Sequence, residues 1–237
     1  MLELSGLALH FGALKVLDGV ELTVPQGAVV GVIGPNGAGK TTLFNVIAGV
    51  LSPSAGSIRF EGRDVGAMPV WDRCRLGIAR TYQIPKPFTN MTVFENVLAA
   101  GLHGGALSMR EASARAEDVL ALVELDHRSS LRAGDLSLLD LKRLELAKAL
   151  GSGPRLLLLD EIAGGLTDAE CDTLLDIIST VRERGTTIVW IEHVIRALRR
   201  IAGTIAVLYN GTFIATGAPD EVLVDRRVKD VYLGAGQ

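Results

Sequence analysis

The stretch GPNGAGKTT, residues 34–42, decides the fold of this chain. It matches G-x-x-x-x-G-K-[ST], the pattern of a loop whose backbone N–H groups surround the phosphates of a nucleotide. The apolar run GAVVGVI (27–33) before it is typical of a buried strand, and TTLFNVIAGVL after it has the apolar spacing of a helix. A strand, a glycine-rich loop and a helix are the context that the motif requires. The sequence therefore predicts a nucleotide-binding loop rather than a chance glycine-rich turn.

Each residue type in this loop has a physical role. Gly34, Gly37 and Gly39 accept backbone angles and close approaches that a Cβ atom would block. The helix that follows directs its first N–H groups and its positive dipole end at the anion. Lys40 is expected to reach the β- and γ-phosphates, and the Thr41 hydroxyl to bind Mg²⁺. The predicted nucleotide-binding residues of the loop are Gly34, Pro35, Asn36, Gly37, Ala38, Gly39, Lys40, Thr41 and Thr42.

Composition narrows the class of protein. The chain has 237 residues, a formal net charge of −3 and a pI of about 5.8, so it lacks the overall positive charge typical of nucleic-acid binding. Cys74 and Cys171 are isolated and have neither metal-ligand spacing nor a disulfide pattern, which fits a reducing cytoplasm. The N-terminal MLELSGLALHF does not have the pattern of a signal peptide.

The mean hydropathy of +0.32 raises the question of a membrane span. The candidate is IAGTIAVLYNGTFIATGAP (201–219), which is close to the length of a spanning helix. However, Asn210-Gly211 lies between the β-rich runs TIAVLY and TFIATG, and Asn-Gly is the strongest short signal for a hairpin. We therefore expect two strands and a turn there, and no span.

The remaining patterns predict an α/β core interrupted by helices. Residues 2–24 and 56–62 are rich in β-formers. Thr92 with Glu95, and Ser108 with Glu111, are capping boxes that open predicted helices. Strand and helix patterns then alternate in RLLLLDE (155–161), TDAECDTLLDIISTVRERG (167–185), TTIVWIEH (186–193) and VIRALRRIA (194–202). We predict one domain, with an α/β core and β-subdomain at 1–85 and 151–237 and a helical subdomain at 86–150.

Two adjacent carboxylates end the predicted strand LLLLDE. Successive side chains of a strand point to opposite faces, so Asp160 and Glu161 can have different roles. Asp160 is expected to hold Mg²⁺ and Glu161 to orient or deprotonate the attacking water. A strand that simply ends in solvated acids is the alternative.

Six elements in order carry a resemblance to a known family: GPNGAGKTT, Gln83 in RTYQIPKPFTNMTVFENV, LSLLDLKRLELAKAL (136–150), LLLLDE, GGLTD (164–168) and His193 in WIEHV. Their order and spacing resemble the ATP-binding subunits of ABC transporters over nearly the whole chain. The resemblance implies a P-loop NTPase core of the ABC ATPase type, with an antiparallel β-subdomain and an inserted helical subdomain. It also implies ATP hydrolysis with ATP and Mg²⁺, and it makes Lys40, Glu161 and His193 the expected catalytic residues.

The resemblance assigns further roles by position. Phe11 is expected to stack on adenine, although a core aromatic is an equal alternative. Gln83 is expected to bind Mg²⁺ together with Thr41 and Asp160, and to respond to the membrane partner. His193 is expected to contact the γ-phosphate. Thr167 and Asp168 fall where the family has its D-loop, and Thr167 also begins a capping box.

The segment Leu136–Asp140 departs from the family, which has L-S-G-G-Q there. Ser137 with Asp140 is itself the pattern of a capping box. In the family, this serine and helix N-terminus bind the γ-phosphate of ATP held by the partner subunit. Leu138 and Leu139 add bulk and Asp140 adds a negative charge. We therefore expect the helix to be present, but the contact of Ser137 with the phosphate to be altered.

Finer resemblance indicates an importer. RTYQIPKPFTNMTVFENV, WIEHV and the tail VKDVYLG resemble the LivG-type ATPases of branched-chain amino acid uptake. This implies integral-membrane permease partners and a second ATPase subunit, with a heterodimer expected and a homodimer as the alternative. It also implies an indirect partner in a solute-binding protein, no nucleic acid, and a peripheral location on the cytoplasmic face of the inner membrane. Soluble ABC-type ATPases and small-molecule P-loop kinases are the alternatives; the former carry coiled-coil arms or second cassettes, and the latter an Arg-rich lid.

Overall fold

The computed structural model describes residues 1–234, with side chains to residue 231. The chain divides into two compact units, one formed by Met1–Val70 with the chain from Thr187 onward and the other by Trp71–Thr186. The predicted helical segment 86–150 lies inside the second unit, which also contains two strands and a long helix.

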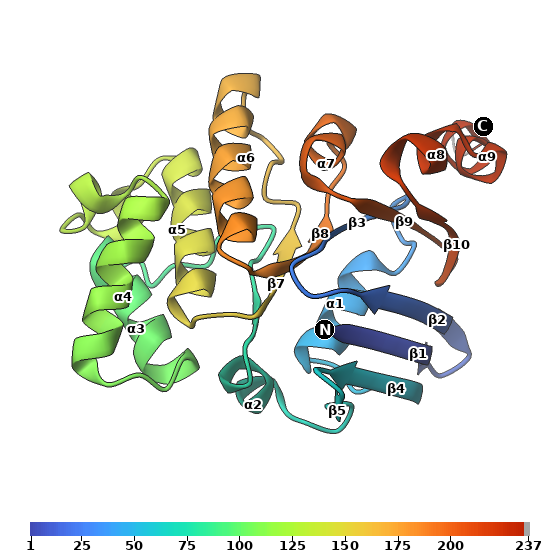
Figure 1. The fold of residues 1–237 in the computed structure, drawn as a ribbon, viewed down its shortest axis with the longest axis horizontal. Coiled ribbons are helices and arrows are strands. Elements are labelled where there is room, and N and C mark those ends of the chain that lie inside the picture. The colour runs from blue at the N-terminus through green and yellow to red at the C-terminus, as the bar shows by residue number, and fades with distance from the viewer. Residues whose placement is uncertain (235–237) are drawn as a thin grey trace. The chain divides into compact units, whose positions relative to one another are not determined.

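The first unit contains an antiparallel sheet with strand order β2-β1-β4-β5 and a second set of strands in the order β10-β9-β3-β8 (Figure 1). Its elements are β1 (Leu2–Phe11), β2 (Leu14–Val24), β3 (Val29–Ile33), α1 (Lys40–Ala48), β4 (Ala55–Phe60), β5 (Arg63–Asp64), β8 (Thr187–Ile191), α7 (Ile195–Ile201), β9 (Thr204–Tyr209), β10 (Thr212–Gly217), α8 (Pro219–Val224) and α9 (Arg226–Gly234).

Strands β3 and β8 form the centre of the first unit. Every residue of both strands is buried, as expected for parallel strands covered on two faces. They pair in parallel with Val32 opposite Ile191, and β9 pairs with β3 on its other side. Residues 34–42 and His193 therefore leave the same edge of this sheet, because parallel strands end on the same side.

The hairpin predicted around Asn210-Gly211 is confirmed. β9 and β10 are antiparallel, with Thr212 opposite Tyr209. Asn210 and Gly211 have φ of +47° and +78°, the positive values that a two-residue turn of this kind requires. Within residues 1–234, no helix is long and apolar enough to cross a membrane.

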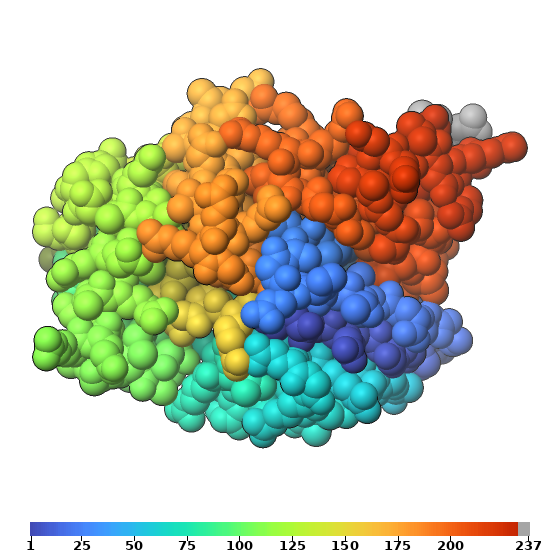
Figure 2. Space-filling model, viewed as in Figure 1, coloured from blue at the N-terminus to red at the C-terminus, as the bar shows by residue number. Residues whose placement is uncertain are grey.

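The second unit is mostly helical and carries two parallel strands, β6 and β7, with Arg80 opposite Leu158. The green surface at the left of Figure 2 belongs to its helices. Its elements are α2 (Val70–Arg75), β6 (Ile78–Arg80), α3 (Val93–Ala99), the π-helix η1 (Ala100–Gly104), α4 (Met109–Leu122), the 3₁₀ turns η2 (Asp126–Arg128) and η3 (Ala133–Asp135), α5 (Leu138–Gly151), β7 (Leu156–Asp160) and α6 (Asp168–Glu183).

Three of the predicted capping boxes are confirmed. Helices α3, α4 and α6 each begin with a hydroxyl that accepts from the N3 backbone, while the N3 glutamate accepts from the cap backbone. Hydrogen bonds from the cap residues lower the pKa of the three glutamates, Glu95, Glu111 and Glu170. Each cap therefore contributes stability that is present at neutral pH and is lost as the pH falls through the lowered pKa.

The sequence did not predict the π-helix that continues α3. Its glycines allow close packing, because a Cβ atom at Gly101 would lie 3.1 Å from the Ala112 Cβ atom. One at Gly104 would lie 3.0 Å from the Ser152 Cβ atom. The helical chain therefore packs closely on α4 and on the end of α5, a constraint that comes from distant residues.

Replacing Gly211 with alanine should destabilise the protein through strain and a clash. The Gly211 N–H donates to the Ala38 carbonyl (3.2 Å), the Asp18 N–H donates to the Gly211 carbonyl (3.0 Å), and a Cβ atom would lie 2.6 Å from the Val16 carbonyl oxygen. A left-handed non-glycine residue costs on the order of 1–3 kcal/mol, and the clash adds to this. Gly19→Ala is the matched control, since Gly19 has φ of +70° and open space. In urea unfolding, an equal loss for both variants would contradict the clash.

Candidate functional site

The phosphate loop joins β3 to α1 in the first unit. Gly39 is the N-cap of α1, and Lys40 is its first helical residue. The Lys40 Nζ atom is buried and donates to the carbonyl oxygens of Gly34 (2.8 Å) and Pro35 (3.0 Å), so the loop curls around its own ammonium group. Thr41 is exposed at the start of the helix. This is the arrangement expected for a loop that surrounds an anion with N–H groups and one cation.

Two of the three loop glycines are required by close backbone approach. A Cβ atom at Gly34 would lie 2.1 Å from the Leu208 carbonyl oxygen, and one at Gly39 would lie 2.8 Å from the Val16 carbonyl oxygen. A Cβ atom at Gly37 would meet no neighbour, so only the positive φ of +80° favours glycine there. The loop is thus held between β2 and the β9–β10 hairpin.

Phe11 and His193 are the other predicted residues in the first unit. Phe11 ends β1 and is 53% exposed, which removes the alternative of a core aromatic. His193 is exposed and lies two residues beyond β8. The buried Glu192 carboxylate accepts from the backbone N–H groups of His193 (2.8 Å) and Val194 (3.2 Å) and so fixes the turn that carries His193. The sequence analysis did not single out Glu192.

In the second unit, Asp160 is held by residues of the neighbouring strand. Its carboxylate is almost fully buried and forms an ion pair with Arg80 (Nη2–Oδ2 2.7 Å), and its backbone N–H donates to the Thr81 hydroxyl (3.1 Å). A buried carboxylate needs such a partner, because an unpaired charge in the interior is costly. Arg80 was missed because an arginine before Gln83 has no local pattern that indicates a partner 80 residues away.

Glu161 differs from Asp160 in its backbone as well as its position. β7 ends at Asp160, and Glu161 has φ of +47°, which is strained for a residue other than glycine. The direction of the Glu161 side chain is therefore set by this left-handed turn and not by strand alternation. The Gln83 side-chain amide donates to the Glu161 carboxylate (2.5 Å), so the structure brings Gln83, Asp160 and Glu161 together.

The donor chemistry of these residues fits Mg²⁺. Mg²⁺ prefers oxygen ligands, keeps several waters and is usually held by one or two carboxylates with substrate phosphates. Asp160 and Gln83 offer a carboxylate and an amide oxygen, and Thr41 in the first unit offers a hydroxyl. Within residues 1–234, no cluster of three His, Cys, Asp or Glu side chains could hold a metal by itself. A metal held with phosphate and water needs no such cluster.

The altered segment LSLLD forms the N-terminus of α5. Ser137 is the N-cap and its hydroxyl accepts from the Asp140 N–H (3.3 Å), as predicted. Like the glutamates of the other caps, the Asp140 carboxylate accepts from its cap hydroxyl (Ser137, 2.7 Å), but it also forms an ion pair with Arg128. The added negative charge expected from the sequence is therefore compensated. Leu138 is half-exposed.

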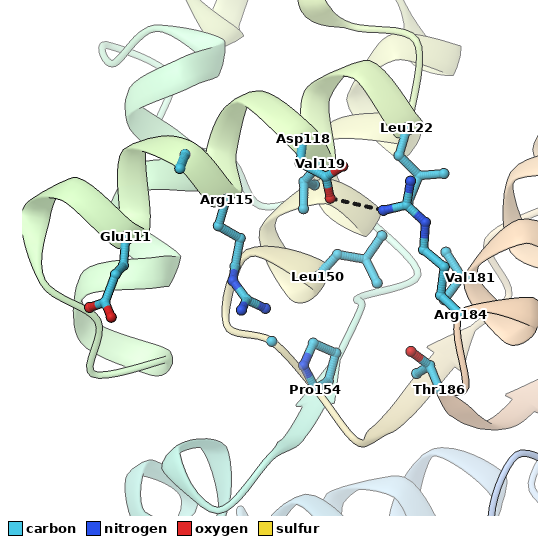
Figure 3. Close-up of a pocket in the computed structure, with 12 residues that line it drawn as sticks. Glu111, Arg115, Asp118, Val119, Leu122, Leu150, Pro154, Val181, Arg184 and Thr186 are labelled. Atoms are coloured by element: carbon cyan, nitrogen blue, oxygen red, sulfur yellow. Dashed lines mark hydrogen bonds and ion pairs between the residues drawn. The ribbon is translucent and has the colours of Figure 1, made fainter.

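The cavities among the described residues include two within the second unit. One of about 410 Å³ is lined by the predicted residues Gln83 and Glu161 together with Leu138, Lys142, Gly165 and their neighbours. The other, of about 610 Å³, lies between α4, the end of α5 and the end of α6 (Figure 3). Asp118 and Arg184 form an ion pair (2.8 Å) across it, and it contains none of the predicted site residues.

Comparisons with known proteins agree with this geometry. The ABC transporter family matches residues 17–164. The high-affinity branched-chain amino acid transport ATP-binding protein BraF of Pseudomonas aeruginosa is 37% identical, covering 99% of this chain and 98% of that protein. LivG of Escherichia coli strain K12, with the same description, is 34% identical at the same coverage.

The solved structures agree as well. A nucleotide-free ATP-binding cassette from an ABC transporter has a TM-score of 0.90 at 30% identity, covering 98% of both chains. The ADP conformation of an ATP-binding cassette of an ABC transporter has a TM-score of 0.90 at 31% identity, covering 99% of this chain and 98% of that one. The predicted fold class is confirmed.

ATP should stabilise the folded protein. A ligand that binds only the folded state at a hundredfold excess over its Kd adds about 2.7 kcal/mol, so thermal melts with ATP should shift upward by several degrees. Lys40→Ala removes the buried ammonium group of the loop and should remove most of the shift. Lys15→Ala, at an exposed lysine of β2, is the control and should keep it. An unchanged shift in Lys40→Ala would contradict the assignment of the loop.

Proposed function

Because the chain belongs to the ABC transporter family as an ATP-binding subunit that hydrolyses ATP to power transport, we propose that it drives the import of branched-chain amino acids. The observation that carries this proposal is the identity of 34–37% over nearly the full length of BraF and LivG, whose names specify that transport. The proposal extends to related small polar solutes of similar size, because the residues described here bind nucleotide and not solute.

The roles of the site residues follow from their chemistry. Residues 34–42 bind the phosphates, with the Lys40 ammonium group at the β- and γ-phosphates and Phe11 available to stack on adenine. Thr41, Asp160 and Gln83 would hold Mg²⁺, which would neutralise negative charge on the phosphates when bound. The hydrogen bond from Gln83 orients the Glu161 carboxylate, which orients the attacking water and accepts its proton. His193, on the turn fixed by Glu192, donates to the γ-phosphate.

Glu161→Gln should leave ATP binding intact and slow hydrolysis by roughly 10²–10⁴, the usual contribution of a general base. The glutamine keeps the shape of the side chain and its hydrogen bond with Gln83 while it removes the proton acceptor. Steady-state release of phosphate and the ATP-induced melting shift measure the two effects separately. Glu183→Gln, at the end of α6, is the control for removal of a carboxylate. A hydrolysis rate within a few-fold of the unaltered protein would show that Glu161 is not the base.

The partners proposed for this subunit are those of an importer. They are integral-membrane permease subunits, a second and different ATPase subunit, and a solute-binding protein that delivers the solute, with this chain on the cytoplasmic face of the inner membrane. A heterodimer is favoured over a homodimer because branched-chain amino acid importers typically pair two different ATPases. The altered LSLLD segment of this chain would then make the two ATP sites unequal.

Purification of the chain with its membrane partners should test the proposed transport. The complex is expected to contain two different ATPase subunits and, in proteoliposomes, to accumulate radiolabelled leucine only with ATP and the solute-binding protein. Lys40→Ala in the same complex is the inactive control. Transport of another solute with no competition from leucine, isoleucine or valine would reject the substrate class and keep the ATPase assignment. A complex with two copies of this chain would reject the heterodimer.

A further inference from the structure

The start of helix α5 carries a carboxylate that is buried and fully engaged. Asp140 is 4% exposed. Its Oδ2 atom accepts from the Ser137 hydroxyl (2.7 Å) and forms the ion pair with Arg128, and its Oδ1 atom lies 3.9 Å from Nη1 of Arg143. Arg143 is itself paired with Glu124 at the end of α4 (2.7 Å). Arg128 is therefore the principal compensating charge for Asp140.

The hydrogen-bonding capacity of Ser137 follows from this arrangement. A serine hydroxyl has one proton to donate and two lone pairs. The Ser137 hydroxyl donates its proton to Asp140 and accepts from the Asp140 N–H. It has no second proton for a phosphate, so at this helix start the donors for an anion are the free backbone N–H groups of the first turn.

An acidic side chain at this point has opposite effects on the helix and on an anion. A carboxylate in the first turn stabilises a helix through the macrodipole. The same charge repels a phosphate that approaches the helix N-terminus. Arg128, which belongs to η2 and is 12 residues away in sequence, cancels that charge while the carboxylate keeps Ser137 in place.

We propose that Arg128 is a positioning residue for ATP hydrolysis: by pairing with Asp140 it compensates the charge of the carboxylate, so that the backbone N–H groups at the LSLLD helix start can bind the triphosphate of ATP held by the partner subunit. This inference rests on the proposed role of that segment toward the partner's ATP. The charge that the altered segment LSLLD gains at Asp140 is thus compensated by Arg128, a residue outside the segment. The arginine side chain is 39% exposed, so it reaches the buried carboxylate from the surface.

The test is the ATPase activity of the assembled transporter with an Arg128→Met variant. The uncompensated carboxylate should raise the ATP concentration for half-maximal hydrolysis about tenfold or more, the scale of one charge-assisted hydrogen bond to phosphate. The increase should shrink at high salt, because salt screens charge repulsion. Binding of ATP to this chain's own phosphate loop, measured by the ATP-induced shift in melting temperature, should not change.

Three further variants separate positioning from general stability. Asp140→Asn in the Arg128→Met background removes the charge and should restore the half-maximal ATP concentration to within a few-fold. Arg128→Lys should retain most activity. Arg110→Met removes an equal charge from an exposed site on α4 and should have no effect. If Arg128→Met alone is too unstable to assemble, the Arg128→Met, Asp140→Asn double variant can still be compared with the unaltered transporter.

The outcomes that overturn the inference are distinct from failure of the proposed function. An Arg128→Met transporter with unchanged ATP dependence, or a defect that Asp140→Asn does not relieve, overturns the role of Arg128. Ser137→Arg tests the segment itself, since a long side chain at an exposed N-cap would block a shared ATP site. If Ser137→Arg has full activity, the segment does not face ATP, and the proposed role of the segment fails together with this inference.

Discussion

The structure depends on one close approach, that of the phosphate loop to the backbone of β9. No side chain fits at Gly34, because a Cβ atom there would lie 2.1 Å from the Leu208 carbonyl oxygen. Gly39 meets Val16 in the same way, and Gly211 donates to the Ala38 carbonyl. The hairpin that hydropathy alone could mistake for a membrane segment is thus the support of the loop. Residues 205–208 of β9 are buried, whereas β10 is half-buried, and the turn contacts the loop where the Gly211 N–H donates to the Ala38 carbonyl.

A second theme is that each acidic side chain of the site is held by a distant polar partner. Arg80 pairs with Asp160, Gln83 donates to Glu161, and Arg128 pairs with Asp140. Buried or half-buried carboxylates need these partners because desolvation of an unpaired charge is costly. The segment from Arg80 to Gln83 holds both carboxylates at the end of β7, so a displacement of this segment would move both at once.

Much of the fold could be predicted because its signals are local. The Asn210-Gly211 turn, the caps at Thr92, Ser108 and Thr167, and the apolar run of β3 all act within a few residues, and the structure confirms each of them. The π-helix after α3 was not predicted, since it depends on close packing of Gly101 against Ala112 on another helix. Propensity and periodicity carry no information on such contacts.

By itself, the sequence determined the phosphate loop, the carboxylates that end β7, the order of the family motifs and the departure at LSLLD, because each is a pattern of neighbouring residues. The tertiary structure decided which charges these residues meet. Asp140 was expected to add a negative charge, yet it is paired with Arg128, and Asp160 and Glu161 are held by Arg80 and Gln83. Such pairs join residues up to 80 positions apart. They form only when folding brings the two ends of the intervening chain together and removes water from the carboxylates. A pattern of neighbouring residues in the sequence therefore does not predict them.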